Sequence, residues 1–324
     1  MKKSIYAPII LFAYNRPWHT EQVLQALKNN YLADKSHLIV FVDGPKRNAS
    51  SEQINNINAV REVVKKEQWC ATVEYHFAEE NIGCRNSIIN GISYVLSEYE
   101  AAIILEDDIV TAPCFLNYMN TCLKVYQDKK AVFSISGMSP NENRFSLPDD
   151  YQYDVFFSHR QLNSGWATWT DRWRMIDWSM DALNEMLADK RLLENYSRGG
   201  DDLIPMIKDQ IDGRSDAWDI QFTYNHFIHH ALSVIPRYSY IDNIGGDGSG
   251  THHLDANASL HFDLSKAIAN PRLPQKIYED KEIINAFYNV FCATKRPLWK
   301  KIINRISRML GGKNVFVIKK KIYA

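Results

Sequence analysis

The stretch AAIILEDDIV, residues 101–110, runs from a short apolar segment directly into three acidic residues. An apolar run of this length between polar segments is typical of a buried β-strand. The acids are Glu106, Asp107 and Asp108, and carboxylates this close raise one another's cost of ionisation. The stretch therefore predicts a buried strand whose end faces something positively charged.

Apolar runs and amphipathic helices alternate around this stretch. Apolar runs of strand length occur at 8–14, 37–43, 72–78, 101–105 and 131–137. We expect helices from about residue 17, at 51–68, where Ser50 or Ser51 can cap the start, and at 84–99. Apolar strands that alternate with helices pair in parallel, with both sheet faces covered. We predict an α/β fold with a mixed, mostly parallel central sheet, helices on both faces and a more irregular second half.

Polar side chains follow four of the predicted strands. In parallel sheets, ligands bind beyond the carboxyl ends of the strands. The groups found there are Asn15 and Arg16 after the first strand, Asp43 after the second, Glu79, Asn81 and Arg85 after the third, and the three acids after the fourth. This recurrence predicts a functional site at that edge of the sheet.

The overall composition is that of a folded, enzyme-sized chain. It has 324 residues, of which 45% are hydrophobic, and its net charge is zero. A chain of this length can bury a substantial core. Ten Lys and Arg but no Asp or Glu follow Glu282, which leaves 28 basic and 38 acidic residues in the rest of the chain. That acidic balance argues against a general nucleic-acid binder.

The five cysteines are odd in number and contain no C-x-x-C pair. We therefore expect neither a zinc site nor a disulfide framework, and a reducing, cytoplasmic compartment. The N-terminal apolar run is short and is interrupted by Asn15, Arg16 and Pro17, which favours a core strand over a signal peptide. No apolar run reaches the roughly eighteen residues that a membrane-spanning helix needs.

The acid triplet has the chemistry of a metal site. Divalent cations such as Mn²⁺ and Mg²⁺ prefer carboxylate oxygens and keep positions open for water and phosphates. A cation held at this strand end would in turn hold a diphosphate and offset the charge that develops on it as a leaving group. The alternative is that Glu106, Asp107 and Asp108 form only a solvated junction between a strand and a loop.

Four short motifs occur in order along the first half of the chain: AYNRP (13–17), VDGP (42–45), ENIG (80–83) and LEDDI (105–109). As a set they resemble the nucleotide-sugar-binding half of GT-A-fold glycosyltransferases. The resemblance is closest to the N-acetylglucosaminyltransferase I type and its bacterial surface-polysaccharide relatives, and it covers roughly residues 6–255. In that family the metal motif is a variant of Asp-x-Asp written Glu-Asp-Asp.

The resemblance divides the chain into two parts. It implies a GT-A catalytic domain at 1–255, with a nucleotide-sugar-binding half at 1–137 and an acceptor half at 138–255. A helical, basic extension at 256–324 follows. The sequence contains no internal repeat and no low-complexity linker.

The resemblance also implies roles for the polar residues at the strand ends. Asp108 would coordinate the metal directly, while Asp107 and Glu106 would contact the ribose, the sugar or metal-bound water. Arg16 would lie along the nucleotide and diphosphate, and Asp43 would hydrogen-bond the uracil ring. Alternatively, Arg16 is a helix-start arginine paired with a nearby acid, and Asp43 is a simple turn residue.

Further donor contacts are implied outside the strand ends. Arg85 lies where the family often places another nucleotide contact. Gly165 would let the backbone approach the sugar closely, and Trp166 would offer an apolar platform beside it. The alternative for Trp166 is the core, where we place Trp169 and Trp173.

The segment NIGGDGSGTHH, residues 243–253, has the composition of a flexible loop. Closure of such a loop over a bound donor is common in enzymes with mobile lids. We assign His252 to the phosphate and His253 to the metal. The alternative is a flexible surface loop whose histidines have no ligand.

An inverting sugar transfer needs one side chain to take the proton of the acceptor hydroxyl. The resemblance places this base on the Asp of the pair Trp218-Asp219. Asp216 remains an alternative base. A third possibility is that both acids only stabilise the start of a helix through its dipole.

The basic segment KRPLWKKIINRISRMLGG, residues 295–312, predicts an amphipathic helix. Its apolar face would carry Ile302, Ile303, Ile306, Met309 and Leu310, and its basic face Lys300, Lys301, Arg305 and Arg308. This composition fits a helix that lies on an anionic membrane surface. The alternatives are packing on the domain and binding to a protein partner.

Together these features predict a metal-dependent, inverting glycosyltransferase that uses Mn²⁺ or Mg²⁺. It would move a sugar from a UDP-sugar, such as UDP-GlcNAc or a related hexose donor, to a glycan or lipid-linked glycan. We expect it in surface polysaccharide synthesis, in the cytoplasm or at the inner face of the membrane. One alternative is a sugar nucleotidyltransferase. That class would need a glycine- and lysine/arginine-rich loop after the first strand, and the segment AYNRPWHTE (13–21) does not supply one. Another is a non-catalytic protein that binds glycans or nucleotide-sugars.

Overall fold

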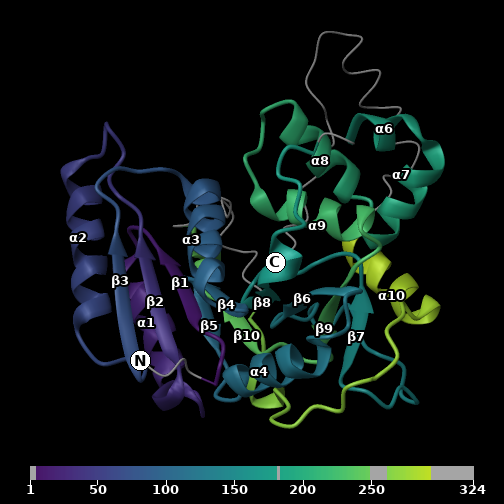
Figure 1. Ribbon diagram of the computed structural model, residues 1–324, viewed down its shortest axis with the longest axis horizontal. Coiled ribbons are helices and arrows are strands. Elements are labelled where there is room, and N and C mark those ends of the chain that lie inside the picture. The colour runs from purple at the N-terminus through teal and green to yellow at the C-terminus, as the bar shows by residue number, and fades with distance from the viewer. Residues whose placement is uncertain (1–4, 181–182, 249–260, 293–324) are drawn as a thin grey trace.

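The computed structural model describes residues 5–180, 183–248 and 261–292. Its centre is an eight-stranded sheet in the order β3-β2-β1-β4-β8-β6-β9-β7 (Figure 1). The strands are β1 (Ile9–Ala13), β2 (His37–Val42), β3 (Thr72–Phe77), β4 (Ala101–Glu106), β6 (Val132–Ser136), β7 (Val155–Ser158), β8 (Trp166–Trp169) and β9 (Leu232–Pro236). A separate two-stranded sheet pairs β5 (Ile109–Thr111) with β10 (Ile241–Asn243).

The first four strands along the chain form the parallel half of the sheet. β1 pairs in parallel with β2 and with β4, and β2 pairs in parallel with β3. The other half is mixed, because β8 is antiparallel to both β4 and β6, and β7 is antiparallel to β9, whereas β6 and β9 are parallel. The predicted α/β class with a mixed, mostly parallel sheet is confirmed.

Helices cover both faces of the sheet (Figure 1). One face packs against α1 (Pro17–Lys28), α2 (Ser51–Lys65), α4 (Phe115–Tyr126) and α10 (Lys281–Phe291), and the other against α3 (Cys84–Glu98), α5 (Thr170–Trp173) and α9 (Trp218–Ile228). Alternation along β1 divides its side chains between the two cores, with Leu11 in the first and Phe12 in the second. A third, smaller core joins α9 to α6 (Leu183–Ala188), α7 (Lys190–Tyr196) and α8 (Leu203–Ile211).

The predicted elements of the first 137 residues match the structure closely. All five residues of β1 are buried, as a continuous apolar run in a covered parallel sheet should be. Ser50 caps α2 through a capping box with Gln53. The short strand β5 and helix α4 were not predicted. β5 is too short to show a period of its own, and it forms only because β10 pairs with it.

The described residues after position 255 pack on the same core as the sheet. Ile283, Phe287, Val290 and Phe291 of α10 are buried among the side chains of the first face. The predicted basic helix at 295–312 lies outside the described residues. None of the helices in the part of the chain that the structure describes is long and apolar enough to cross a membrane.

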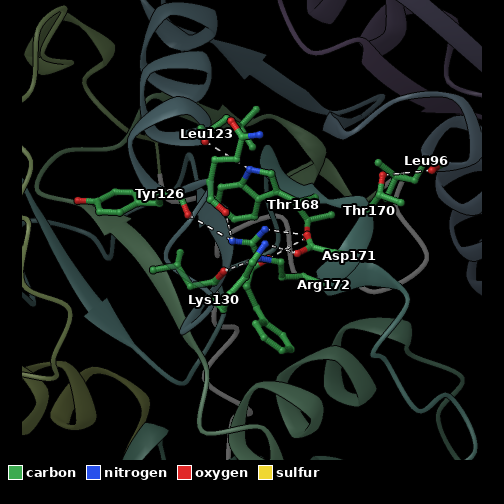
Figure 2. A network of polar contacts seen from close by, with 12 residues as sticks. Leu96, Leu123, Tyr126, Lys130, Thr168, Thr170, Asp171 and Arg172 are labelled. Carbon is green, nitrogen blue, oxygen red and sulfur yellow. Dashed lines mark hydrogen bonds and ion pairs between the residues drawn. The ribbon is translucent and has the colours of Figure 1, made fainter.

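A buried arginine ties α4, β6 and α5 together (Figure 2). Arg172 is 1% exposed, and its guanidinium donates hydrogen bonds to the backbone oxygens of Tyr126 (3.3 Å), Gln127 (2.5 Å) and Val132 (3.3 Å) and to the Asp171 carboxylate (2.7 Å). It also lies 4.4 Å from the centroid of the Trp169 ring. Because Tyr126 ends α4, the cation is placed well for the negative end of that helix dipole.

We expect Arg172→Met to lower the free energy of unfolding by about 3 kcal/mol, because three backbone oxygens would lose their buried donor. Urea unfolding measures this. The matched control is Arg174→Met, since Arg174 is exposed and its loss should change stability by less than about 0.5 kcal/mol. Equal effects of the two substitutions would contradict the structural role of Arg172.

Candidate active site

The carboxyl ends of β3, β2, β1 and β4 meet at one edge of the sheet. The chain adds β2 and β3 on one side of β1 and then crosses to add β4 on the other. Ligands of open α/β sheets bind at such a reversal of strand order. Arg16 follows β1 and the acid triplet begins at the last residue of β4, so the two sequence motifs flank this point.

Arg16 is the positive partner that the acid triplet requires. Its Nη2 atom donates to Asp107 Oδ1 and, at 3.0 Å, to Asp108 Oδ2. The backbone N–H of Tyr14 lies 3.4 Å from the other oxygen of Asp107. Burial by itself would lower the pKa of Arg16, but the two carboxylates outweigh it and raise that pKa. The structure thus pairs the two motifs, as expected for a strongly charged, largely buried edge.

Glu106 carries the least compensated charge at this edge. No hydrogen bond or ion pair of its carboxylate occurs within the described residues. The pKa of Glu106 is raised to about 8, mainly by burial and also by the negative charges of Asp108, Asp107 and Asp219, while Arg16 lowers it. Asp219 comes from α9, far along the chain, and yet it acts on the same carboxylate. The fold therefore brings the predicted metal acids and the predicted base into one electrostatic environment.

The segment after β10 closes one side of the acid triplet. β10 pairs with β5, which follows the acids directly, and the backbone N–H of Ile244 donates to the backbone oxygen of Asp108 at 2.9 Å. A Cβ atom on Gly245 would lie 2.2 Å from Asp108 Oδ2 and 3.1 Å from Arg16 Nη1. Only glycine can occupy this position without displacing the ion pair, which explains one glycine of the NIGGDG segment.

The carboxylate oxygens of the acid triplet are suitable ligands for a divalent cation, although Arg16 occupies two of the acids, Asp107 and Asp108, in this structure. Carboxylate oxygens are the ligands that Mn²⁺ and Mg²⁺ prefer. Within residues 5–180, 183–248 and 261–292, no three His, Cys, Asp or Glu side chains are grouped to hold a metal ion. The buried Nη1 donor of Arg16 has no hydrogen bond within the described residues.

Asp43 lies at the end of β2 with its carboxylate fully used. Its two oxygens accept hydrogen bonds from the backbone N–H groups of Gly44 (2.8 Å), Ile82 (3.1 Å) and Gly83 (3.2 Å) and from the side-chain amide of Asn81 (2.8 Å). A carboxylate offers about four acceptor positions, so none remains free. The predicted contact with uracil would require one of these donors to move.

Arg85, in the first turn of α3, points to the second half of the molecule. Its Nε atom donates to Gln221 Oε1 at 2.9 Å and lies 3.4 Å from Asp216 Oδ1. Both partners belong to the start of α9 or the residues just before it. Asp216 is largely exposed, whereas Gln221 is buried. The predicted nucleotide contact through Arg85 stays a prediction, and the structure adds a link between α3 and α9 that the sequence did not indicate.

Asp219 lies in the first turn of α9 and accepts a hydrogen bond from Asn163 Nδ2 at 3.2 Å. Asn163 belongs to the loop between β7 and β8, so this contact joins two segments of the second half. Sequence reasoning missed Asn163, which lies two residues before Gly165. α9 begins at Trp218, so the helix start considered as the alternative role for Asp219 is present.

Trp166 lies in the core and offers no face to a ligand in this structure. It is 1% exposed and stacks on Trp218 with ring centroids 5.2 Å apart. The predicted platform role therefore does not match its position, because alternation along β8 turns this side chain toward α9. Trp169 and Trp173 are buried, as predicted. Gly165 is needed for packing, since its φ is +59° and a Cβ atom would lie 2.8 Å from Ile241 Cγ2.

The predicted histidines of the glycine-rich loop, His252 and His253, lie outside the described residues. The described start of the loop contacts α1 instead. His19 Nε2 is 3.1 Å from Asp247 Oδ2, and the His19 side chain is buried. This contact and the position of Gly245 bring the segment 244–248 against both Arg16 and Asp108.

Cys84 is a further residue of the site that sequence reasoning missed. It is the first residue of α3 and is solvent-exposed. Burial of the thiol, together with the negative charges of Glu106, Asp107, Asp219 and Asp108, raises its pKa to about 12. No pattern in the sequence marks this cysteine, because its surroundings come from β4 and α9.

No protein-family model matches the sequence, and no curated protein matches it either. Several solved structures are distantly similar. UDP-glucose pyrophosphorylase complexed with UDP-glucose has a TM-score of 0.32 and 10% identity, covering 52% of this chain and 78% of that one. TarS of S. aureus has a TM-score of 0.39 and 11% identity, covering 75% of this chain but only 37% of that one.

A third similar structure is 4-diphosphocytidyl-2C-methyl-D-erythritol synthase from Anaerococcus prevotii, with a TM-score of 0.31 and 11% identity. It covers 59% of this chain and 83% of that one. At TM-scores this low, none of the three similarities supports a conclusion about the activity of this chain. The functional conclusion depends on the residues of the site.

We expect Gly245→Ala to lower the free energy of unfolding by about 1–3 kcal/mol, because its Cβ atom must displace Asp108 from Arg16. In an Asp108→Ala background the same substitution should cost much less, since the obstructing carboxylate is gone. Urea unfolding of the four proteins of this cycle measures the difference. Gly248→Ala is the control: nothing lies near its Cβ, so its backbone strain at φ +90° should cost the same in both backgrounds. A Gly245 penalty that does not depend on Asp108 would contradict the described packing.

Proposed function

We propose that the protein is a metal-dependent, inverting glycosyltransferase of the GT-A type that transfers a sugar from a UDP-sugar to a glycan acceptor. The observation that carries the proposal is the convergence of three groups at the carboxyl edge of the sheet. These are the acid triplet after β4, Arg16 after β1, and Asp219 from α9, whose charge acts on Glu106. They supply the parts that such a transfer needs: a holder for the diphosphate and a base for the acceptor.

The diphosphate side of the reaction would use Arg16 and the acid triplet. Asp108 would coordinate Mn²⁺ or Mg²⁺, which supplies positive charge at the diphosphate when bound, and Asp107 and Glu106 would contact the ribose, the sugar or metal-bound water. Arg16 would keep one hydrogen bond to the acids and turn its unpaired Nη1 donor to a phosphate oxygen. The buried, water-poor surroundings strengthen both contacts, because charges interact more strongly at low dielectric.

The acceptor side of the reaction would use Asp219. Its carboxylate would take the proton from the acceptor hydroxyl as that oxygen attacks the sugar, which is general base catalysis. The amide of Asn163 would orient the carboxylate, since it already donates to one of its oxygens. Asp216 remains the alternative base, but its exposure and its contact with Arg85 favour it less.

The acceptor and the cellular place are further parts of the proposal. Surface polysaccharide synthesis in the cytoplasm would supply a glycan or a lipid-linked glycan. The basic segment 295–312 would bring the enzyme to an anionic membrane surface, where lipid-linked acceptors lie. UDP-GlcNAc or a related hexose donor is the first to test.

We expect a UDP-sugar to raise the melting temperature by roughly 5 °C at about 100 times its Kd, and only when Mn²⁺ is present. Asp108→Ala should abolish most of this shift, because the cation would lose its main ligand. The measurement is a thermal-shift screen of nucleotide-sugars with and without Mn²⁺. The control is Asp128→Ala, which removes an exposed carboxylate of the same kind away from the site. A shift of equal size without metal would remove the proposed role of the triplet.

We expect Asp219→Asn to lower turnover by about 100- to 10,000-fold while the affinity for the donor stays the same, because only proton transfer is lost. Release of UDP in the presence of a glycan acceptor measures turnover, and calorimetry measures donor affinity. Asp216→Asn is the matched comparison and should change turnover little. If Asp216→Asn proves the more damaging substitution, the base is Asp216.

A further inference from the structure

Hydrogen bonds at both ends of the segment 81–85 link the end of β2 to the start of α9. They begin at Asp43, whose carboxylate accepts all four of its hydrogen bonds from residues 44 and 81–83. These bonds fix the segment 81–83, which leads directly into α3 through Gly83 at φ +84°. The Asp43 carboxylate therefore helps to set the direction in which α3 begins, together with the hydrogen bonds of Asn81 to the backbone oxygens of Gly44 and Pro45.

Arg85 carries the connection from α3 to α9. It follows the fixed segment by two residues, and its Nε atom donates to Gln221 Oε1 at 2.9 Å. The amide nitrogen of Gln221 in turn donates to the backbone oxygen of Trp178 at 2.7 Å. Gln221 is 3% exposed, whereas the Arg85 side chain is 23% exposed, so the hydrogen bond between them is partly buried. A hydrogen bond to a charged group is stronger than one between neutral groups.

Asp219 stands two residues before Gln221, in the same first turn of α9. The acid triplet stands on β4, which packs against α3. α3 thus contacts both the strand that leads into the acids and the helix bearing Asp219. A shift of α9 along α3 would change the distance between Asp219 and the acid triplet. Reaction rates fall steeply when reacting groups are misplaced by even about 1 Å.

We infer that Arg85 and Gln221 are positioning residues that set Asp219 relative to the acid triplet, with Asp43 securing the near end of the link. The inference rests on the proposed function. It departs from the expectation that Asp43 and Arg85 are nucleotide contacts, because every acceptor position of Asp43 and the Nε donor of Arg85 are already used within the protein.

The two roles of Arg85 predict different kinetics. A nucleotide contact contributes to donor binding, so its loss raises the Kd for UDP. A positioning residue leaves donor binding intact, and its loss lowers kcat. For Arg85→Met we expect a Kd for UDP with Mn²⁺ within about twofold of the wild-type value and a kcat lower by about 100-fold. Gln221→Met should have the same effects, and the double variant should lose little more, because both substitutions break one link.

Two controls separate positioning from general destabilisation. Asn90→Ala changes an exposed residue of the same helix α3, and it should leave kcat and Kd unchanged. Arg172→Met destabilises the fold away from the link, and below its unfolding transition it should also leave kcat unchanged. A loss of kcat in Arg172→Met as large as in Arg85→Met would overturn the inference.

Amide hydrogen exchange tests the link without any activity. In Arg85→Met we expect faster exchange at residues 217–222 of the full-length protein, while the strands of the parallel half keep their protection. Unchanged exchange at 217–222 would overturn the inference, and so would a Kd for UDP that rises about tenfold or more in Arg85→Met. If the wild-type protein neither binds UDP nor transfers sugar, the proposed function fails, and the exchange measurement still decides whether Arg85 holds α9.

Discussion

The ion pair between Arg16 and the two acids after β4 is the interaction on which the arrangement of the site depends. Three consecutive carboxylates at a largely buried edge repel one another, and burial makes each charge costlier still. Arg16 offsets this by donating to Asp107 and Asp108 from the neighbouring strand end. The contact also joins the β1 and β4 ends at the point where the strand order reverses, which is where ligands of open α/β sheets bind.

The second half of the chain supports this ion pair from two sides. The β5–β10 ribbon, whose first strand follows the acids directly, places Gly245 against Asp108 and Arg16. α9 carries Asp219 in its first turn, and the charge of Asp219 raises the pKa of Glu106. The site is therefore a joint product of both halves. In the proposed function, the parallel strands would supply the groups for a diphosphate and the irregular half would supply the base.

The contacts of α3 explain how the two halves keep their alignment. The Asp43 carboxylate accepts three hydrogen bonds from residues 81–83, which lead into α3, and Arg85 then donates to a buried glutamine of α9. Residues that look like ligand contacts in the sequence can serve the geometry of the site instead. A carboxylate whose four acceptor positions are filled by its own chain has little left for a ligand. The same reasoning moves Trp166 from the donor site to the core, where Trp218 covers its ring.

Local pattern alone determined the elements of the first half and their parallel arrangement. A run such as IILFA and a capping signal such as Ser50 act over a few residues, so sequence suffices to predict β1 and α2. It likewise placed Arg16, Asp43 and the acids at strand ends. Only the tertiary structure decided which of these groups meet, because contacts such as Arg85 to Gln221 and Asn163 to Asp219 join segments with no shared local signal. The pKa of Glu106 depends on the same long-range packing, since charges and burial act through space and not along the chain.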